Sequence, residues 1–342
     1  MRKDIMHYRV LTNRTKIVIV DYKDTLNRDL QMEIDILKEM IPDCKVVILE
    51  YEDTKQKKEE LIHELKDADA VKTAFVMLDR SILSECRHLK CISFNSTGFN
   101  NVDKKYAKDC GIAIMNVPEY CTDEVADHTI MLMLSLNKNL KVYDNMVMKK
   151  HRWTYRLPMG SHSLSEQTLG IIGFGKIGRA VAKKAKVFGM RVLVSSNHVG
   201  KDEQQKYGVE YASMEEIQKY ADIISIHTNL NAGNQKMIDE DFFMSLQKQP
   251  IFINVSRGNL VDEQALIKAL DRGSIRAAGL DVLESESPDM SKSMLCGRDN
   301  VIITPHAAFY SEESVRKLHE ISTRNIAYYL LGQKEKVYDF VQ

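Results

Sequence analysis

The chain has 342 residues, which is too long for a single hydrophobic core. Single cores stop growing at about 250 residues, and longer chains divide into domains. Its 44% hydrophobic and 28% charged residues are typical of a globular protein, so we expect two folded domains. Lys plus Arg and Asp plus Glu both total 48, so no net charge favours nucleic acid, an anionic membrane surface or a polyanionic partner.

The beginning of the chain and its cysteines favour a cytoplasmic protein. Residues 1–7 contain neither the apolar core nor the cleavage site of a signal peptide. The most apolar helical stretch, residues 129–136, is too short to cross a bilayer, so we expect no membrane segment. The six cysteines include no C-x-x-C pair, and we interpret them as reduced, small apolar fillers.

Short β-branched runs alternate with helical patterns in the first third of the chain, as in a parallel sheet with helices on its faces. Strands are expected at residues 16–20, 46–49, 70–75, 91–94 and 112–115. Helices are expected at residues 30–40, 55–66 and 81–86. This part of the chain therefore predicts an α/β domain.

A helix is predicted next, with Thr122 as its N-cap, acids in its first turn and a pattern that continues to about Lys150. A second α/β series follows, with strands near residues 169–173, 191–195, 222–227, 250–254, 276–281 and 301–304. We expect this series to form a doubly wound sheet. The last helix, residues 312–331, is expected to pack back on the first domain.

These elements predict an α/β protein of two Rossmann-like domains with a cleft between them. The first is a flavodoxin-like substrate domain, discontinuous in sequence, formed by residues 1–120 and 307–342. The second is a doubly wound dinucleotide-binding domain formed by residues 121–306.

A G-x-G-x-x-G motif stands between the first strand and the first helix of the second series. In such a motif Gly173 permits the tight turn, Gly175 lets the backbone approach a pyrophosphate, and Gly178 lets the helix pack closely on the strand. Lys176 and Ile177 lie between them, where the helix N-terminus offers N–H donors to an anion. The motif in this context predicts a bound dinucleotide.

The second strand of this domain lacks the acidic residue that binds the ribose 2′-hydroxyl of NAD. Ser196 occupies that position and is followed by Asn197 and His198. A carboxylate would repel the 2′-phosphate of NADP, so its absence admits NADP, which Asn197, His198 or Lys201 could contact. A hydroxyl could equally replace the carboxylate in binding NAD, so both NAD and NADP remain open.

Three later segments place polar residues after predicted strands, at the edge where α/β sheets bind ligands. Together with two earlier segments they resemble the D-isomer-specific 2-hydroxyacid dehydrogenase family, over nearly the whole chain from about Lys16. The segments are residues 97–103, 123–129, 254–262, 279–286 and 303–310. The pair Phe309 and Tyr310 resembles the D-lactate dehydrogenase and C-terminal-binding-protein branches, which points to an apolar or small substrate side chain.

The resemblance implies a catalytic Arg, Glu and His, which fall on Arg257, Glu286 and His306, with Glu284 as the alternative register for the acid. A guanidinium can hold the carboxylate and carbonyl of a 2-oxo acid together. An imidazole can exchange a proton with the 2-hydroxyl oxygen near neutral pH. A carboxylate beside that imidazole favours its protonated form and fixes its tautomer.

Further contacts are implied by the same resemblance. Cofactor contacts fall on Thr228, Asn229, Asn234, Val255, Ser256 and Asp281, the last facing the nicotinamide carboxamide. Substrate contacts fall on Asn95, Thr97, Gly98 and Tyr310. For Gly98 the alternative is a tight turn without a ligand.

The sequence leaves two functions to compare. The first is an NAD(P)-dependent oxidoreductase that interconverts a small 2-oxo acid and a D-2-hydroxy acid. The second is a corepressor-like protein that senses NAD(H) without turnover, although no added partner-binding tail is evident. The resemblance suggests a homodimer. The ten histidines form no H-x-x-x-H or Cys/His cluster, so we expect no metal site.

Overall fold

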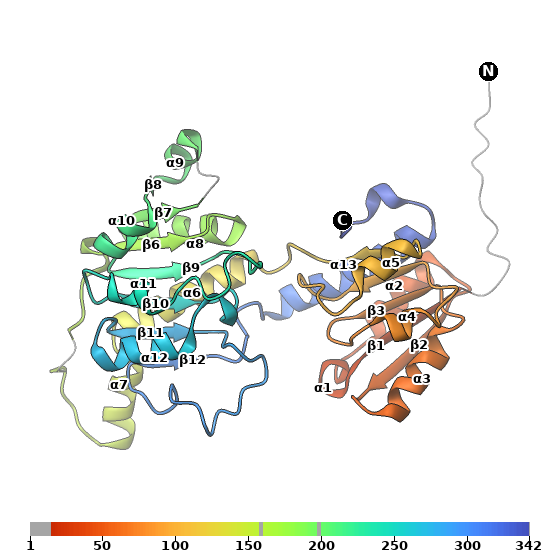
Figure 1. The fold of residues 1–342 in the computed structure, drawn as a ribbon, viewed down its shortest axis with the longest axis horizontal. Helices are drawn as coiled ribbons and strands as arrows, with labels where there is room; N and C mark the ends of the chain where they lie inside the picture. The colour runs from red at the N-terminus through yellow and green to blue at the C-terminus, as the bar shows by residue number, and fades with distance from the viewer. Residues whose placement is uncertain (1–14, 157–159, 197–199, 342) are drawn as a thin grey trace. The chain divides into compact units, whose positions relative to one another are not determined.

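The computed structural model describes residues 15–156, 160–196 and 200–341. The chain forms two compact units, one of residues 1–120 and 312–342 and the other of residues 121–311 (Figure 1). Each contains a parallel β-sheet with helices on both faces, which confirms the predicted α/β class. The sequence places the return to the first unit at residue 307, whereas the structure places it at Glu312, the first residue of the last helix.

The first unit has a five-stranded sheet of order β2-β1-β3-β4-β5, in which every neighbouring pair is parallel. This is the flavodoxin-like strand order, and its switch point lies between β1 and β3. The strands are β1 (Lys16–Tyr22), β2 (Lys45–Tyr51), β3 (Ala70–Thr73), β4 (Cys91–Phe94) and β5 (Ala113–Met115). They confirm the five strands expected in this part of the chain.

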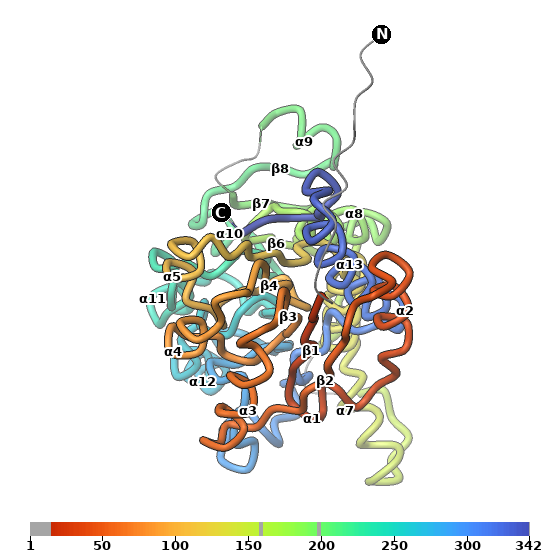
Figure 2. Tube along the Cα trace, turned by 90° about the vertical axis from the view of Figure 1, so that its right-hand side faces the viewer, coloured from red at the N-terminus to blue at the C-terminus, as the bar shows by residue number. Residues whose placement is uncertain are grey.

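Helices cover both faces of this sheet, as Figure 2 shows. Buried residues of α3 (Lys55–Leu65), α4 (Arg80–Leu83) and α5 (Lys104–Asp109) pack on one face. Those of α2 (Gln31–Met40) and α13 (Glu312–Leu330) pack on the other. The short helices α1 (Lys23–Leu26) and η4 (Lys334–Lys336) complete the unit.

The second unit has a seven-stranded parallel sheet of order β12-β11-β10-β9-β6-β7-β8. Its strands are β6 (Thr168–Ile172), β7 (Arg191–Ser195), β8 (Glu210–Tyr211), β9 (Ile223–Ile226), β10 (Ile251–Asn254), β11 (Ala277–Leu280) and β12 (Val301–Ile303). The order reverses between β6 and β9, so the doubly wound topology is confirmed. Ligands bind such sheets where the order reverses, at the carboxyl ends of the strands.

Alternate strand residues of this sheet pack on two helical layers. Buried residues of α6 (Thr122–Asn137) and α8 (Lys176–Val187) cover one face. Those of α10 (Met214–Tyr220), α11 (Glu240–Met244) and α12 (Glu263–Arg272) cover the other. The shorter helical segments are α7 (Leu140–Asp144), η1 (Asn145–Lys149), η2 (Leu164–Glu166), α9 (Lys201–Tyr207) and η3 (Gly258–Leu260).

The prediction of one helix from residue 122 to about residue 150 is wrong. The backbone of Asn139 is left-handed, with φ of 53°, and a left-handed residue cannot continue an α-helix. Asparagine adopts this conformation more readily than most residues, so α6 ends before it and α7 starts after it. The N-cap is Cys121, and Thr122 is already helical.

Not all six cysteines are the small apolar fillers that we expect. Cys110 and Cys296 are exposed, so these two are not buried fillers, whereas Cys44, Cys86 and Cys91 are buried. No helix among the described residues is both long and apolar enough to cross a bilayer.

A buried ion-pair cluster joins β3, α2 and α13 in the first unit. Lys72 Nζ donates to Glu33 Oε1 and to Thr323 Oγ1, the latter at 2.8 Å, and Arg28 Nη1 donates to Glu33 Oε2. Burial opposes the charge of Glu33, but Lys72 and Arg28 outweigh it and lower the pKa of Glu33 to about 2. Burial lowers the pKa of Lys72 to about 8, so both groups are charged at pH 7.

Replacing Lys72 by Met is expected to lower the free energy of unfolding of the first unit by about 3 kcal/mol, because buried Glu33 then loses its lysine partner and keeps Arg28 and the more distant His319. The double variant Lys72→Met/Glu33→Leu should recover most of this loss in urea titrations. Because Glu33 has a lowered pKa in the folded state, the pair's stabilisation is present above about pH 4.5 and declines as pH falls toward 2. A double variant no more stable than Lys72→Met would contradict the pairing argument.

Candidate functional site

The G-x-G-x-x-G loop lies at the switch point of the second sheet. The backbone of Gly173 is left-handed, with φ of 93°, and a Cβ there would lie 2.4 Å from the carbonyl oxygen of His227 at the end of β9. A Cβ on Gly178 would lie 2.4 Å from the carbonyl oxygen of Gly173, so helix α8 packs closely on the turn. A Cβ on Gly175 would meet no atom within 4 Å.

These glycines fit a dinucleotide phosphate. Gly175 is the N-cap of α8, and it has no side chain to cover the N–H groups of the first turn. Lys176 is exposed and Ile177 is half-buried in that turn. The space in front of Gly175 and the direction of the helix therefore suit an approaching pyrophosphate.

The end of β7 lies beside the glycine loop, because Gly173 N donates to Ser195 O at 2.9 Å. Ser196 follows directly and is half-buried. Asn197 and His198 lie outside the described residues. Ser196 is thus at the strand end where a ribose-binding acid would stand.

His306 and Glu286 are in contact, although twenty residues separate them in the sequence. His306 Nδ1 lies 2.7 Å from Glu286 Oε2, and the imidazole and carboxylate are 40% and 62% exposed. The hydrogen bond to His306 lowers the pKa of Glu286, and the charge of Arg257 adds to this effect. The carboxylate therefore stays ionised beside the imidazole in a site open to solvent.

The alternative acid, Glu284, is engaged elsewhere. Its Oε1 accepts from the backbone N–H of Glu263 at 3.1 Å and from Lys236 Nζ at 3.0 Å. The structure therefore brings Glu286, and not Glu284, to His306.

Arg257 follows β10 and is half-buried, and its Nη1 donates to the carbonyl of Ser256 at 2.7 Å. The next residue, Gly258, touches the loop that carries Glu286. A Cβ on Gly258 would lie 1.8 Å from the carbonyl oxygen of Leu283, so no other residue fits without moving one of the two loops. The contact fixes the loop of Arg257 against the loop of Glu286. The sequence did not predict this role for Gly258, although the glycine next to Arg257 was a signal for it.

Asp281, which the resemblance places facing the nicotinamide carboxamide, has a fully buried side chain whose oxygens accept from protein groups. Its Oδ1 accepts from Thr304 Oγ1 at 2.5 Å and from the N–H of Ala307 at 2.9 Å, and its Oδ2 accepts from the N–H of Ala308 at 2.9 Å. Asp281 therefore organises the loop that carries His306. This structural role of Asp281 could not be predicted from the sequence, because the Asp281 carboxylate precedes the groups that donate to it by more than twenty residues.

The remaining cofactor residues lie at the carboxyl ends of β9 and β10. Thr228 is half-buried, and its backbone nitrogen lies near Gly173. Asn229 is exposed. Asn234 uses both ends of its side-chain amide to close its own loop, donating to Asn229 O and accepting from Asn231 N, each at 2.7 Å. Val255 is buried, and Ser256 Oγ donates to Ile226 O at 2.7 Å.

The predicted substrate residues are divided between the two units. Asn95, Thr97 and Gly98 follow β4 in the first unit. Asn95 is buried and its Oδ1 accepts from Ser322 Oγ at 3.1 Å, whereas Thr97 is exposed and its Oγ1 donates to Val117 O at 3.1 Å. Tyr310 belongs to the second unit and is 65% exposed, four residues after His306.

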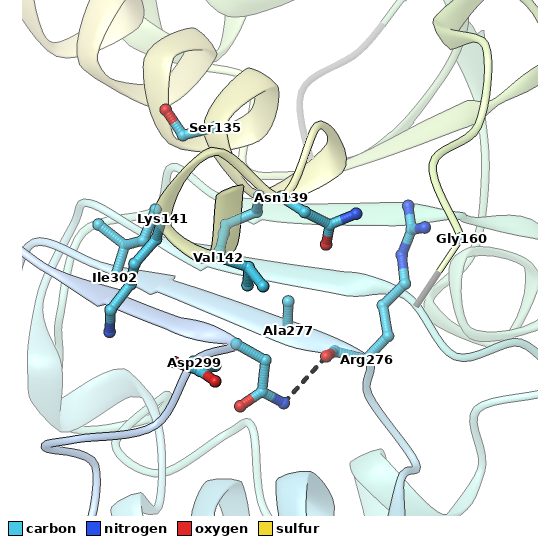
Figure 3. A pocket seen from close by; sticks show the side chains of 11 residues that line it. Ser135, Asn139, Lys141, Val142, Gly160, Arg276, Ala277, Asp299 and Ile302 are labelled. Carbon is cyan, nitrogen blue, oxygen red and sulfur yellow. Dashed lines mark hydrogen bonds between the residues drawn. The ribbon is translucent and has the colours of Figure 1, made fainter. Parts of the chain in front are cut away.

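A small cavity of about 20 Å³ in the second unit lies at the opposite, amino-terminal edge of β11 and β12. Figure 3 shows Arg276, Asn139 and Lys141 around it. Arg276 donates to Asn137 and Gln167, and Lys141 donates to two backbone carbonyls, so protein groups already accept from both cations. The cavity has room for about one water molecule. In the described part of the chain, no three His, Cys, Asp or Glu residues gather as metal ligands.

Comparison with known proteins shows the family to which the chain is related. Residues 130–308 match the family described as D-isomer specific 2-hydroxyacid dehydrogenase, NAD binding domain. A glyoxylate reductase of Korarchaeum cryptofilum is 32% identical over 305 residues, which cover 88% of this chain and 87% of that protein.

Solved structures show the same similarity over both units. A D-lactate dehydrogenase from Aquifex aeolicus, complexed with NAD and lactic acid, is 29% identical with a TM-score of 0.81, covering 95% of this chain and 98% of that one. An acyclic imino acid reductase in complex with NADPH and D-Arg is 27% identical with a TM-score of 0.80, and the match covers 96% of this chain and 100% of that one. The chain therefore belongs to the D-isomer specific 2-hydroxyacid dehydrogenase family, a family of NAD(P)-dependent oxidoreductases.

Proposed function

We propose that this protein reduces a small 2-oxo acid to the D-2-hydroxy acid with NADH or NADPH, through Arg257, Glu286 and His306. The observation that carries the proposal is the 2.7 Å contact of His306 with Glu286, to which Arg257 adds its charge. A protein that only sensed the nucleotide would not need a paired acid and imidazole in an accessible site. The geometry therefore favours the enzyme over the sensing protein.

Each side chain has a distinct chemical task in this proposal. The Arg257 guanidinium holds the substrate carboxylate and polarises the neighbouring carbonyl. The dihydronicotinamide, when bound at the Gly173 loop, supplies the hydride that C2 accepts. The protonated His306 imidazole gives its proton to the resulting alkoxide, which leaves a neutral imidazole and the 2-hydroxy acid. Glu286 stabilises the imidazolium and holds the ring in one tautomer.

The test is a steady-state assay of NADH and NADPH oxidation with glyoxylate, pyruvate and branched or aromatic 2-oxo acids. We expect turnover with the small or apolar members of the panel and a D-configured product on chiral chromatography. Binding of both nucleotides without turnover on any 2-oxo acid would instead support the sensing function.

We infer that Ser196 allows the site to accept NADPH. Ser196 is uncharged at the strand end beside the glycine loop, and a structural relative is complexed with NADPH. Replacing Ser196 by Asp should lower the ratio of kcat/KM for NADPH over NADH by about 100-fold, because a carboxylate repels the 2′-phosphate. Ser196→Asn introduces a side chain of the same size as Asp but without charge, so it should change this ratio by less than about 5-fold. Equal effects of the two variants would contradict the charge argument.

We also propose a homodimer formed through the second unit. Large apolar side chains gather on residues 140–155, where Leu140, Met148, Trp153 and Tyr155 are 59%, 68%, 91% and 79% exposed. A second copy of the chain is the partner that the family resemblance suggests, and apolar anchors of this kind dominate interface energies.

Light scattering should therefore give twice the mass of the chain. The substitution Trp153→Asp should raise the dimer dissociation constant at least about 30-fold. The matched control is Val187→Asp, because Val187 is 83% exposed on α8 of the same unit and lies outside residues 140–155. A monomeric wild type, or equal weakening by both variants, would overturn this proposal.

A further inference from the structure

The loop between β12 and α13 is fastened to helix α6 through a hydroxyl. Thr304 Oγ1 lies 2.9 Å from His128 Nε2 and 2.5 Å from Asp281 Oδ1. His128 comes from the second turn of α6, and its side chain is 15% exposed. The three residues thus form one contiguous chain of hydrogen bonds. His128 has no role in the chemistry proposed above.

The directions of these hydrogen bonds follow from their partners. Both carboxylate oxygens of Asp281 accept backbone N–H groups, so this side chain acts as an acceptor and the Thr304 hydroxyl donates to it. The hydroxyl then has lone pairs left to accept from His128, which must carry a proton on Nε2. Burial lowers the pKa of His128 despite the opposing charge of Asp281, and a neutral ring with its proton on Nε2 meets this need.

The loop held by Asp281 has a strained backbone at His306. The φ angle of His306 is 51°, in the left-handed region that side chains other than glycine seldom occupy. Such a conformation is unfavourable for a residue with a side chain and persists only where the surroundings impose it. The backbone N–H of His306 donates to Asp281 O at 2.8 Å, so Asp281 holds this residue through its carbonyl and the two following residues through its carboxylate.

A second contact fastens the other end of the same loop to α6. Ser311 Oγ donates to Glu124 Oε1 at 3.0 Å. Glu124 and His128 are four residues apart and therefore lie on one face of α6, one turn above the other. The loop that carries His306 is thus attached to α6 both before and after His306 in the sequence.

We propose that His128 and Thr304 are positioning residues for His306, acting through Asp281 as a hydrogen-bonded relay from α6 to the proton-donating imidazole. The proposal rests on the proposed function, because it assumes that the placement of His306 limits turnover. Without the relay the loop relaxes from its left-handed conformation, and the contact of His306 with Glu286 is lost for part of the time.

The relay is tested with Thr304→Val, which removes the hydroxyl at nearly constant shape, and Thr304→Ser, which keeps it. We expect Thr304→Val to lower kcat by about 30-fold while the dissociation constant of the nucleotide changes by less than about 3-fold. Thr304→Ser should recover most of this loss. His128→Ala should lower kcat by about 10-fold, and the double variant should be no slower than Thr304→Val, because both changes break one chain.

The matched control is Asp127→Asn, next to His128 on α6, which removes only the surface ion pair with Lys184 at 2.9 Å. Its kcat should stay within about 2-fold of wild type. Equal rates for Thr304→Val and Thr304→Ser, or an additive double variant, would overturn the relay.

A readout independent of activity is the histidine side-chain NMR spectrum, with the His306 signal assigned by its absence in His306→Gln. Thr304→Val should shift this signal in the same direction as Glu286→Gln, since both weaken one contact. An unshifted signal would overturn the relay even in an active enzyme. If the wild type reduces no 2-oxo acid, the proposed function fails, and the NMR comparison alone decides whether the relay positions His306.

Discussion

Replacing His306 by Ala is expected to lower kcat for 2-oxo acid reduction by about 10³-fold, because the alkoxide formed at C2 then has no positioned proton donor. The dissociation constant of NADPH or NADH should change by less than about 3-fold, because the glycine loop that would bind the nucleotide does not include His306. Stopped-flow nucleotide oxidation and fluorescence titration of the bound nucleotide measure these two quantities. Activity close to wild type would refute the assignment of His306 as the proton donor.

The two acids of the same loop provide a matched control for this prediction. Glu286→Gln removes the carboxylate that contacts His306, whereas Glu284→Gln removes one that contacts Glu263 and Lys236. Without Glu286 the imidazole loses the carboxylate that orients it, so kcat for reduction should fall by about 10- to 100-fold. Glu284→Gln should leave kcat within about 2-fold of wild type. The reverse order of effects would assign the acid to Glu284.

Replacing Arg257 by Gln is expected to lower kcat/KM for the 2-oxo acid by about 10³-fold. The guanidinium can form two charge-assisted hydrogen bonds to the substrate, and each typically contributes about 1.5 to 3 kcal/mol. Both KM and kcat should change, because the same group holds the carboxylate and polarises the carbonyl. Steady-state kinetics over a wide range of substrate concentration separates the two effects.

Two arginine variants sharpen this result. Arg257→Lys keeps the charge but loses the forked geometry, so it should recover only part of the activity. Arg272→Gln is the control, because Arg272 is 56% exposed on α12 and pairs with Glu240 at 2.8 Å on the surface of the same unit. Its kcat/KM should remain within about 2-fold of wild type. A loss as large as that of Arg257→Gln would indicate a general effect on the fold.

Local pattern in the sequence was enough for much of the fold. Runs such as residues 16–20 predicted the strands, because β-branched apolar residues favour strands that are buried on both faces. Gly173 and Gly178 predicted the dinucleotide turn, because both positions leave no room for a side chain. Helix ends were harder to predict, and Asn139 shows why: its left-handed backbone is one option among several for an asparagine, and only the packed chain selects it.

The sequence by itself thus determined the α/β class, the glycine turn and the residue types available for acid and base chemistry, because each depends on neighbours within a few positions. Only the tertiary structure decided that Glu286 and not Glu284 contacts His306, that Gly258 locks two loops together, and that Asp281 supports the loop of His306. The physical reason is that these contacts join the ends of neighbouring parallel strands, about twenty or more residues apart in the chain. Sheet order and loop packing bring those ends together, and spacing in the sequence does not encode either.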